Sequence, residues 1–527
     1  MLRSRTCLGG MVTAPHHLAT EAGTSVLREG GNAIEAMIAA AATIAVVYPH
    51  MNAIGGDGFW LVSKAGAAPV GIRACGQAAQ LATVESYREN GDTIIPTRGP
   101  RAALTVAGAV GGWAVAKLLA ESWGGRMPLT RLLDPAQHHA TYGVPITSSQ
   151  ERLTREKWDE LSGVTGFAET LAPEGPMAEG SVLKQPALAA TMGGLAEAGL
   201  DDFYRGDIGR ALAAGLEAVG SPLRLADLEA YRAVRVAPAE AQVGHGRVFN
   251  MPPPTQGISS LMILTLFEAL GVSEPDGFAH IHGLVEATKR AFILRNAHVG
   301  DPDRMGNVWK SWLDQEVIAR EAAAIDMHNA SPWPHIAADG DTIWMGAIDR
   351  HGNAVSYIQS IFWEFGSGVV VPGTGVLWQN RGASFTLHPG PNELGPGRLP
   401  FHTLNPAMAL LNDGRSIAYG TMGGEGQPQT QAAIFSRHVL FGQDMQAAVT
   451  APRWLLGRTW GASSTNLKLE ARFDGSLIDA LSKAGHDVEV VGAYDDMMGH
   501  AGAVSIDRNG VIRGATDPRA DGSCVGI

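Results

Sequence analysis

A threonine, Thr342, begins a stretch that is typical of a β-strand, directly after an irregular run from Ser331 to Gly340. A threonine hydroxyl is a poor nucleophile unless a base takes its proton. The α-amino group of the same residue becomes that base if the chain is cut in front of it. An α-amine titrates at about 8, close to the pH at which a general base works best. Cleavage between Asp341 and Thr342 would therefore create a self-contained nucleophile.

The elements expected to position Thr342 are two consecutive strands, 343–348 and 355–361, joined by the turn signal His351-Gly352-Asn353. Before them, 259–270 and 279–298 carry apolar residues at helical spacing and end at helix breakers. The later chain predicts strands at 369–371 and 416–419 and helices at 427–440 and 477–483. Periodicity alone thus indicates a mixture of α and β structure.

A threonine at a strand start is weak evidence by itself, because strands are rich in threonine. The surrounding motifs, however, occur in a specific order along nearly the whole chain. They are Gly31-Asn32-Ala33-Ile34-Glu35-Ala36, Gly55-Gly56-Asp57-Gly58-Phe59, Met251-Pro252-Pro253-Pro254-Thr255, Gly300-Asp301-Pro302-Asp303, Thr342-x₆-Asp349-x₂-Gly352-Asn353, Phe365-Gly366-Ser367-Gly368, Gly423-Gly424 and Asp517-Pro518-Arg519. In order and spacing the chain resembles the γ-glutamyltranspeptidase family of N-terminal-nucleophile hydrolases.

The resemblance implies an α/β (α+β) fold, a four-layer αββα sandwich. It also implies a precursor that cuts itself into a large subunit, 1–341, and a small subunit, 342–527, which together form one unit. Thr342 would be the nucleophile, and Ser360 matches a family threonine that hydrogen-bonds the nucleophile. The family places its oxyanion hole at the glycines that match Gly423 and Gly424, where backbone N–H groups can stabilise developing charge.

The chain departs from the family at the positions that bind the α-amino and α-carboxylate groups of a γ-glutamyl donor. The family's arginine position falls on Cys75, with Arg73 and Gln77 nearby, and the later positions read Phe362, Arg381, Ser384, His402 and Thr403. The family's acidic residue is missing, and a guanidinium, which binds a carboxylate through two parallel hydrogen bonds, is gained.

At these positions the chain resembles the oxamate amidohydrolase-like branch of the family. We therefore expect a small-molecule amide substrate with a carboxylate, anchored by Arg381, Thr403, His402 and Ser384 and closed off by Phe362. The alternative is a γ-glutamyltransferase or glutathione hydrolase. We expect the two cleaved subunits to stay associated, and a dimer of such heterodimers is a further expectation.

Two other classes compete with this interpretation. A metal-dependent amidohydrolase would use His280-Ile281-His282, but residues i and i+2 of a helix do not share a face. No Asp or further His is spaced to complete a site, so we expect neither metal nor cofactor. A non-catalytic family member would be expected to lose Thr342 or the glycine pair, and this chain keeps both.

Composition also limits the classes of partner and the cellular location that we expect. The formal net charge of −12, without a cluster of Lys or Arg, argues against nucleic acid. The longest apolar run, Met37–Tyr48, is too short to span a bilayer and predicts a buried helix instead. The first ten residues do not reach an apolar core of signal-peptide length. Three widely spaced cysteines fit a reducing compartment, so the expected location is the cytoplasm.

Overall fold

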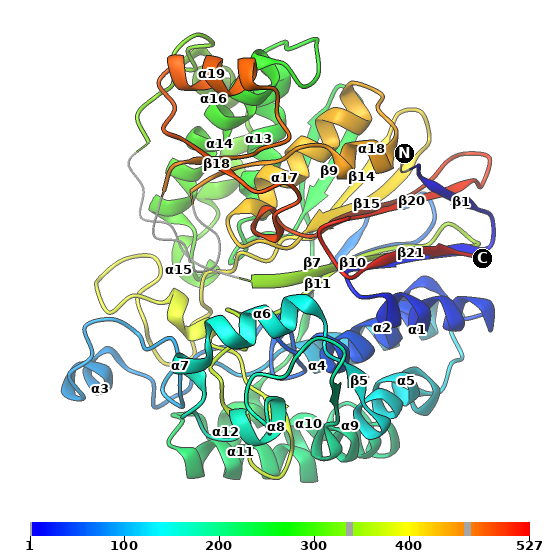
Figure 1. The fold of residues 1–527 in the computed structure, drawn as a ribbon, viewed down its shortest axis with the longest axis vertical. Helices are drawn as coiled ribbons and strands as arrows, with labels where there is room; N and C mark the ends of the chain where they lie inside the picture. The colour runs from blue at the N-terminus through cyan, green and yellow to red at the C-terminus, as the bar shows by residue number, and fades with distance from the viewer. Residues whose placement is uncertain (1–2, 334–340, 458–464) are drawn as a thin grey trace.

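Two antiparallel sheets stack face to face at the centre of the molecule, and helices cover both outer faces (Figure 1). The structure, a computed structural model, describes residues 3–333, 341–457 and 465–527. The β10 sheet has the strand order β21 (Ser523–Gly526), β2 (Gly10–Ala14), β10 (Asp341–Asp349), β11 (Ala354–Phe362), β3 (Asp57–Ser63), β4 (Val70–Ala74), β7 (Val234–Val236). The β15 sheet has the order β1 (Arg5–Cys7), β20 (Ile512–Thr516), β19 (Ala501–Ile506), β15 (Ser416–Thr421), β14 (Ala407–Leu411), β9 (Gly246–Asn250), β8 (Ala239–Val243).

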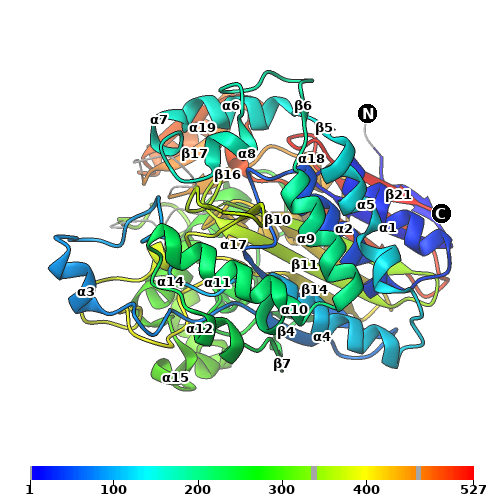
Figure 2. The ribbon, with the colours of Figure 1, turned by 90° about the horizontal axis from the view of Figure 1, so that it is seen from below.

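The helices divide between the two outer faces. Against the β10 sheet pack α1 (His17–Arg28), α2 (Ala33–Val47) and α4 (Ala109–Ser122), with α5 (Leu129–Tyr142) and α9 (Pro186–Ala198) farther out (Figure 2). Against the β15 sheet pack α13 (Gly257–Ala269) and α17 (Gly426–Phe435), with α14 (Phe278–His298) behind them. The order of layers is therefore α, β, β, α. This confirms the four-layer sandwich expected from the family resemblance.

Further elements complete the helical layers and the edges of the sheets. They are α3 (Val84–Glu89), α6 (Ser148–Glu156), α7 (Trp158–Leu161), α8 (Phe167–Leu171), α10 (Asp202–Arg205), α11 (Asp207–Val219), α12 (Leu225–Ala230), α15 (Pro302–Met305), α16 (Gln315–Ala323), α18 (Met445–Thr450), α19 (Gly475–Lys483), and the small sheets β5 (Val144–Pro145) with β6 (Val182–Leu183), β12 (Val370–Val371) with β13 (Val376–Leu377), and β16 (Trp454–Leu456), β17 (Leu467–Glu470), β18 (Val488–Val491). No helix of the described residues is long and apolar enough to cross a membrane.

Helix α2 is the apolar segment that the sequence predicted to be buried, and every one of its residues is buried. Its N-terminus is satisfied by a capping box, in which Asn32 and Glu35 accept each other's backbone N–H groups. Asp349, at the end of β10, accepts a further hydrogen bond from the N–H of Ala33 (3.1 Å). The end of β10 is thereby fixed to the start of α2.

The turn between β10 and β11 explains the spacing Asp-x₂-Gly-Asn. The Asp349 carboxylate accepts hydrogen bonds from the backbone N–H groups of His351 and Asn353, and Gly352 has a φ of +79° that a residue with a side chain rarely adopts. The turn fixes the pairing of the two strands from Ile348 opposite Ala354 to Ile343 opposite Gln359. It therefore determines which residues of β11 lie beside Thr342.

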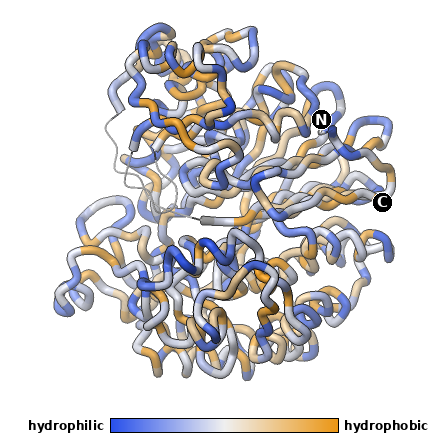
Figure 3. The backbone as a smooth tube through the Cα atoms, viewed as in Figure 1, coloured by the Kyte–Doolittle hydropathy of each residue, from blue (hydrophilic) through white to orange (hydrophobic). Residues whose placement is uncertain are grey.

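Between the sheets, Trp344 of β10 fills the space over two glycines of the β15 sheet. The central strands carry apolar stretches mixed with polar ones (Figure 3), and Trp344 is buried between the two sheets. Gly420 and Gly502 lie opposite each other on β15 and β19. A methyl group at Gly420 would overlap the indole ring, and one at Gly502 would lie 2.6 Å from it. The indole N–H donates to Ser356 Oγ on β11 (2.9 Å).

Gly420→Ala should destabilise the protein by about 1–3 kcal/mol, because the added methyl group forces the indole ring and the two sheets apart. Urea denaturation measures the change. Gly475→Ala is the matched control, since its added methyl group meets open space, and it should change stability by less than about 1 kcal/mol. Equal stability of the two variants would show that the sheets do not depend on this contact.

Candidate active site

Thr342 lies near the start of β10 and is fully buried. The pairing of β10 with β11 shifts register between Asp341 and Ile343, so that Thr342 sits at an irregularity of the ladder. Its hydroxyl accepts a hydrogen bond from Gln427 Nε2 (3.4 Å), at the start of α17. Gln427 Oε1 accepts in turn from the N–H of Asn405 (3.1 Å). The side chain of Gln427, to which the sequence analysis gave no role, thus links Thr342 to the other sheet.

Ser360 lies on β11, the strand beside β10, directly opposite Asp57 of β3. Its hydroxyl accepts a hydrogen bond from the N–H of Phe362 (2.8 Å), where the chain has a φ of +82° that is unusual for a phenylalanine. Three adjacent strands therefore carry Thr342, Ser360 and Asp57 at the same end of the sheet. The expected contact of Ser360 with the nucleophile stays a prediction.

Gly423 and Gly424 form the connection between β15 and α17, with φ values of +112° and +50°. Among the described residues, neither of their N–H groups has a hydrogen-bond acceptor. The carbonyl groups do have partners, since Gly423 accepts from the N–H of Gly426 and Gly424 accepts from Gln256 Nε2. Two donors thus remain available at the positively polarised N-terminus of a helix.

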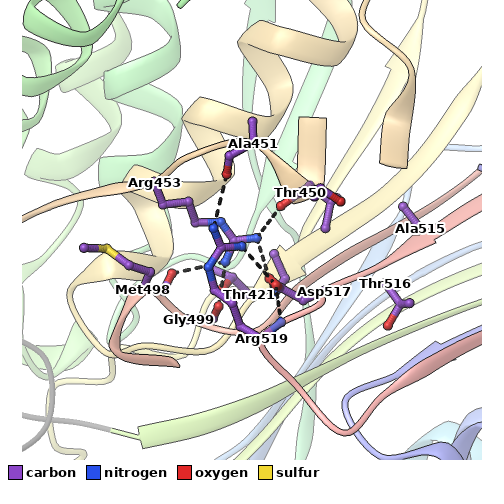
Figure 4. Close-up of polar contacts among 12 residues, drawn as sticks. Thr421, Thr450, Ala451, Arg453, Met498, Gly499, Ala515, Thr516, Asp517 and Arg519 are labelled. Atoms are coloured by element: carbon purple, nitrogen blue, oxygen red, sulfur yellow. Dashed lines mark hydrogen bonds and ion pairs between the residues drawn. The ribbon is translucent and has the colours of Figure 1, made fainter. Parts of the chain in front are cut away.

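A buried network of charges, drawn in Figure 4, holds Gly499, which is the nearest neighbour of Gly423 outside its own segment. Arg453 donates to the carbonyl groups of Met498 and Gly499 and pairs with Asp517. Asp517 also pairs with Arg519, which contacts Glu470 through two hydrogen bonds of 2.7 and 2.6 Å.

Gly499 lies so close to Thr421 and Met422 that an added methyl group would overlap them. The network therefore fixes the segment against which the Gly423 turn packs. The motif Asp517-Pro518-Arg519 therefore has a structural role, because its two charged residues belong to this network.

Arg381 begins a short 3₁₀ turn, Arg381–Ser384, and its guanidinium is buried with the Cζ atom 3.9 Å from the centre of the Phe362 ring. None of its three nitrogens has a hydrogen-bond partner among the described residues. Burial lowers its pKa to about 9, and Asp57 and Cys75 oppose that shift. The other buried arginines, Arg295, Arg437, Arg453 and Arg519, each pair with a carboxylate at ion-pair distance.

Three more buried side chains carry polar atoms without a hydrogen-bond partner in the described part of the chain, and two of them, Asp57 and His402, interact electrostatically with Arg381. They are Asp57 (Oδ2), His402 (both ring nitrogens) and Thr403 (Oγ1), judged against the described residues. His402 Nε2 lies 3.5 Å from Asp57 Oδ2. Burial, with the positive charges of Arg381 and Arg73, lowers the pKa of His402 well below its ordinary value, so that its ring is neutral. Of the expected residues, Arg381 and His402 lie close enough for the guanidinium to affect the imidazole, and Thr403 follows His402 in the chain.

The structure adds a carboxyl group that the sequence analysis did not place in this pocket. The position of the family's acidic residue is Ser384, and its hydroxyl donates to the carbonyl groups of Arg381 and Phe401 (2.8 and 3.0 Å). Ser384 thus connects the Arg381 turn to the His402 segment. Asp57, from β3, brings a carboxyl group to the pocket instead, so the view that the pocket lacks an acid was incomplete.

The histidine cluster also differs from expectation. His280 and His282 do point to different neighbours, since His280 Nε2 contacts Ser436 Oγ (2.8 Å) and His282 Nδ1 contacts His486 Nε2 (2.9 Å). A further histidine does complete a group, however, because His486 and Glu286 bring their ligand atoms within 4.8 Å of His282.

Glu286 pairs with the ammonium of Lys289 (2.7 Å), and His282 Nε2 contacts the carbonyl of Asp326 (2.8 Å). The Lys289 ammonium already balances the Glu286 carboxylate, as a metal ion would. The cluster fastens residues 326–331 to α14.

The buried threonine, the serine of the adjacent strand and the two glycine N–H groups lie within two facing sheets covered by helices, which is the fold of an N-terminal-nucleophile hydrolase. The γ-glutamyltranspeptidase profile matches residues 19–527, and the chain therefore belongs to the γ-glutamyltranspeptidase family. It is 51% identical to the oxamate amidohydrolase proenzyme of Klebsiella pneumoniae, over 100% of both chains. It is 38% identical to the glutathione hydrolase-like YwrD proenzyme of Bacillus subtilis, over 98% of each. The cephalosporin acylase of Bacillus halodurans has the same fold, with a TM-score of 0.92 and 32% identity over 100% of this chain and 97% of that one.

Asp517→Asn should lower the free energy of unfolding by about 3–5 kcal/mol, because it leaves two buried guanidinium groups without their shared carboxylate. Burial would raise the pKa of Asp517, but Arg453 and Arg519 hold it below its ordinary value. The stabilisation is therefore present above about pH 4 and lost as the pH falls through the folded pKa. Denaturation against pH measures it.

The matched control is Asp207→Asn, which removes an exposed carboxylate paired with Arg210 and should cost less than about 1 kcal/mol. A loss in Asp517→Asn no larger than in this control would contradict the structural role of the network.

Proposed function

We propose that the chain cuts itself between Asp341 and Thr342 and then hydrolyses the amide bond of a small amide acid such as oxamate. The observation that carries the substrate class is Arg381. A buried guanidinium without a counter-ion is costly, and every other buried arginine of the described chain is paired. A substrate carboxylate would supply the missing partner through two parallel hydrogen bonds.

In self-cleavage, Thr342 Oγ1 attacks the carbonyl carbon of Asp341, the peptide C–N bond breaks, and the nitrogen leaves as the new α-amine of Thr342. Water then hydrolyses the ester. The products are residues 1–341 and 342–527, which stay together because β10 and β11 of the small subunit pair with β2 and β3 of the large one. This pairing across the two products supports an associated heterodimer.

In turnover, the α-amine takes the proton of the Thr342 hydroxyl, and Oγ1 attacks the amide carbonyl. The N–H groups of Gly423 and Gly424 would bind the oxyanion, and Ser360 would orient the nucleophile's amine or hydroxyl. The amine returns its proton to the leaving nitrogen, and ammonia departs. Water, activated by the same amine, hydrolyses the acyl-enzyme and releases the dicarboxylate.

A γ-glutamyltransferase or glutathione hydrolase is the second candidate, and Asp57 is the observation that favours it. An ionised carboxylate beside Arg381 could bind an α-ammonium group while Arg381 binds the α-carboxylate. Two features weigh against it. Phe362 lies under the guanidinium, and the full-length relative with 51% identity is an oxamate amidohydrolase.

Thr342→Ala should remain a single uncut chain, because no hydroxyl is left to attack the Asp341 carbonyl. Thr342→Ser should still cut, since it keeps the hydroxyl. Denaturing electrophoresis and N-terminal sequencing measure the outcome, with Thr421→Ala as a control that alters a threonine outside the cut. A wild-type chain that is uncut and fully active would refute the proposal.

Arg381→Ala should lower kcat/KM for oxamate about a hundredfold or more, as expected for loss of a charge-assisted pair of hydrogen bonds. Arg381→Lys should recover only part, because an ammonium cannot bind two oxygens in parallel. Steady-state kinetics on cleaved enzyme measure both. Arg415→Lys, at an exposed pair with Asp413, is the control and should match wild type. An Arg381→Lys variant with wild-type kcat/KM would contradict the anchoring role.

A further inference from the structure

Asp57 is a buried carboxyl group whose two oxygens have different surroundings. Oδ1 accepts three hydrogen bonds, from the N–H groups of Gly76 and Gly108 and from Gln379 Nε2, at 3.2, 3.0 and 3.2 Å. Oδ2 has no hydrogen-bond partner among the described residues and lies 3.5 Å from His402 Nε2. Three donors therefore hold the group in one orientation, with Oδ2 directed toward His402.

The position of Asp57 matches the length of a small amide acid. Neighbouring strands lie about 4.8 Å apart, so the backbone of Asp57 on β3 lies about 10 Å from that of Thr342 on β10, with β11 between them. The two side chains shorten the remaining gap. A substrate such as oxamate, with its amide carbon at the Thr342 hydroxyl and its carboxylate oxygens two bonds from that carbon, would direct the carboxylate toward Asp57 and Arg381.

An ionised Asp57 would repel that carboxylate inside a buried pocket, where charges are weakly screened. Burial raises the pKa of Asp57 to about 7, although Arg381 and the three donors to Oδ1 favour the ionised form. Six titratable groups lie close enough to interact with the Asp57 carboxyl group. They are Arg381, His402, Cys75, Tyr204, Tyr231 and Tyr357. Burial keeps His402, Cys75 and the tyrosines neutral near pH 7, which leaves Arg381 as the charged group facing Asp57.

We propose that Asp57 determines specificity for anionic substrates by binding them in its protonated form, with the Oδ2–H group donating to the same carboxylate that Arg381 holds. This inference rests on the proposed function of the site. Binding takes one proton from solvent: the Asp57 carboxylate and a proton become the acid, which then shares its hydrogen with the substrate carboxylate. The like charge of the bound substrate favours this uptake.

The two candidate substrate classes then predict opposite pH dependences. A carboxylate without an ammonium group requires protonated Asp57, so its KM should rise with pH above the pKa of the free carboxyl. An α-ammonium group would instead prefer ionised Asp57, so the KM of a γ-glutamyl donor should fall as the pH rises. The sign of the slope reports which charge Asp57 faces.

The test is KM for oxamate on cleaved enzyme between about pH 6 and about pH 8.5. Wild type should show KM rising toward about tenfold per pH unit at the alkaline end. Asp57→Asn keeps an oxygen for the three donors and an N–H for the substrate, so its KM should be independent of pH. Asp496→Asn, which alters a half-buried carboxyl of raised pKa, is the control and should keep the wild-type slope.

Calorimetry with oxalate, in two buffers of different ionisation enthalpy, measures proton uptake without turnover. At a pH above 7, wild type should take up close to one proton per oxalate and Asp57→Asn close to none. Absence of uptake in wild type, failure of oxalate to bind, or a folded and cleaved Asp57→Asn enzyme that loses affinity more than tenfold would overturn the proposal. Proton uptake with oxalate but no hydrolysis of oxamate would instead reject the proposed function and retain the role of Asp57.

Discussion

The contact between the two sheets at Trp344 is the constraint on which the site depends. Thr342 and the glycine turn lie on different sheets, at the start of β10 and beyond the end of β15. The separation of the two sheets therefore sets the distance between Thr342 and the glycine turn. A substrate carbonyl must reach both of them. Trp344 is two residues from Thr342, and Gly420 is three residues from Gly423. The indole ring therefore packs against a glycine three residues before Gly423, and a bulkier pair there would move Thr342 and the glycine turn apart.

Two buried groups of charged residues differ in whether every guanidinium has a carboxylate partner. Behind the glycine turn, Arg453 and Arg519 share Asp517 and reach Glu470, so each guanidinium has a carboxylate and the segment at Gly499 is held in place. The other group is Arg381. Its neighbours are an aromatic ring, a neutral histidine and a carboxyl group whose pKa is raised. The first arrangement is complete without a ligand. The second leaves its guanidinium without a partner among the described residues, which is the property expected of an anion-binding site.

The sequence predicted the elements well where local rules decide them. The pattern at 343–348 and 355–361 with its Asp-Gly-Asn turn, and the apolar run that became α2, correspond to β10, β11 and a fully buried helix. Local rules could not locate the partners of a side chain from distant segments. The hydrogen bond from Gln427 to Thr342, the proximity of His402 to Asp57 and the contact of His486 with His282 all join segments far apart in the sequence. Asp57 was present in the motif Gly55-Gly56-Asp57-Gly58-Phe59, but only the pairing of β3 with β11 shows where its carboxyl group lies.

The central claim is that this family member accepts a small carboxylate without an α-ammonium group. The most direct measurement is the ratio of kcat/KM for oxamate to that for a γ-glutamyl anilide, on self-cleaved wild-type enzyme at one pH. The account predicts a ratio above about a hundred, since a γ-glutamyl donor would place its ammonium beside Arg381 and Phe362. A ratio below one would contradict it and would identify the pocket as that of a γ-glutamyltransferase or glutathione hydrolase.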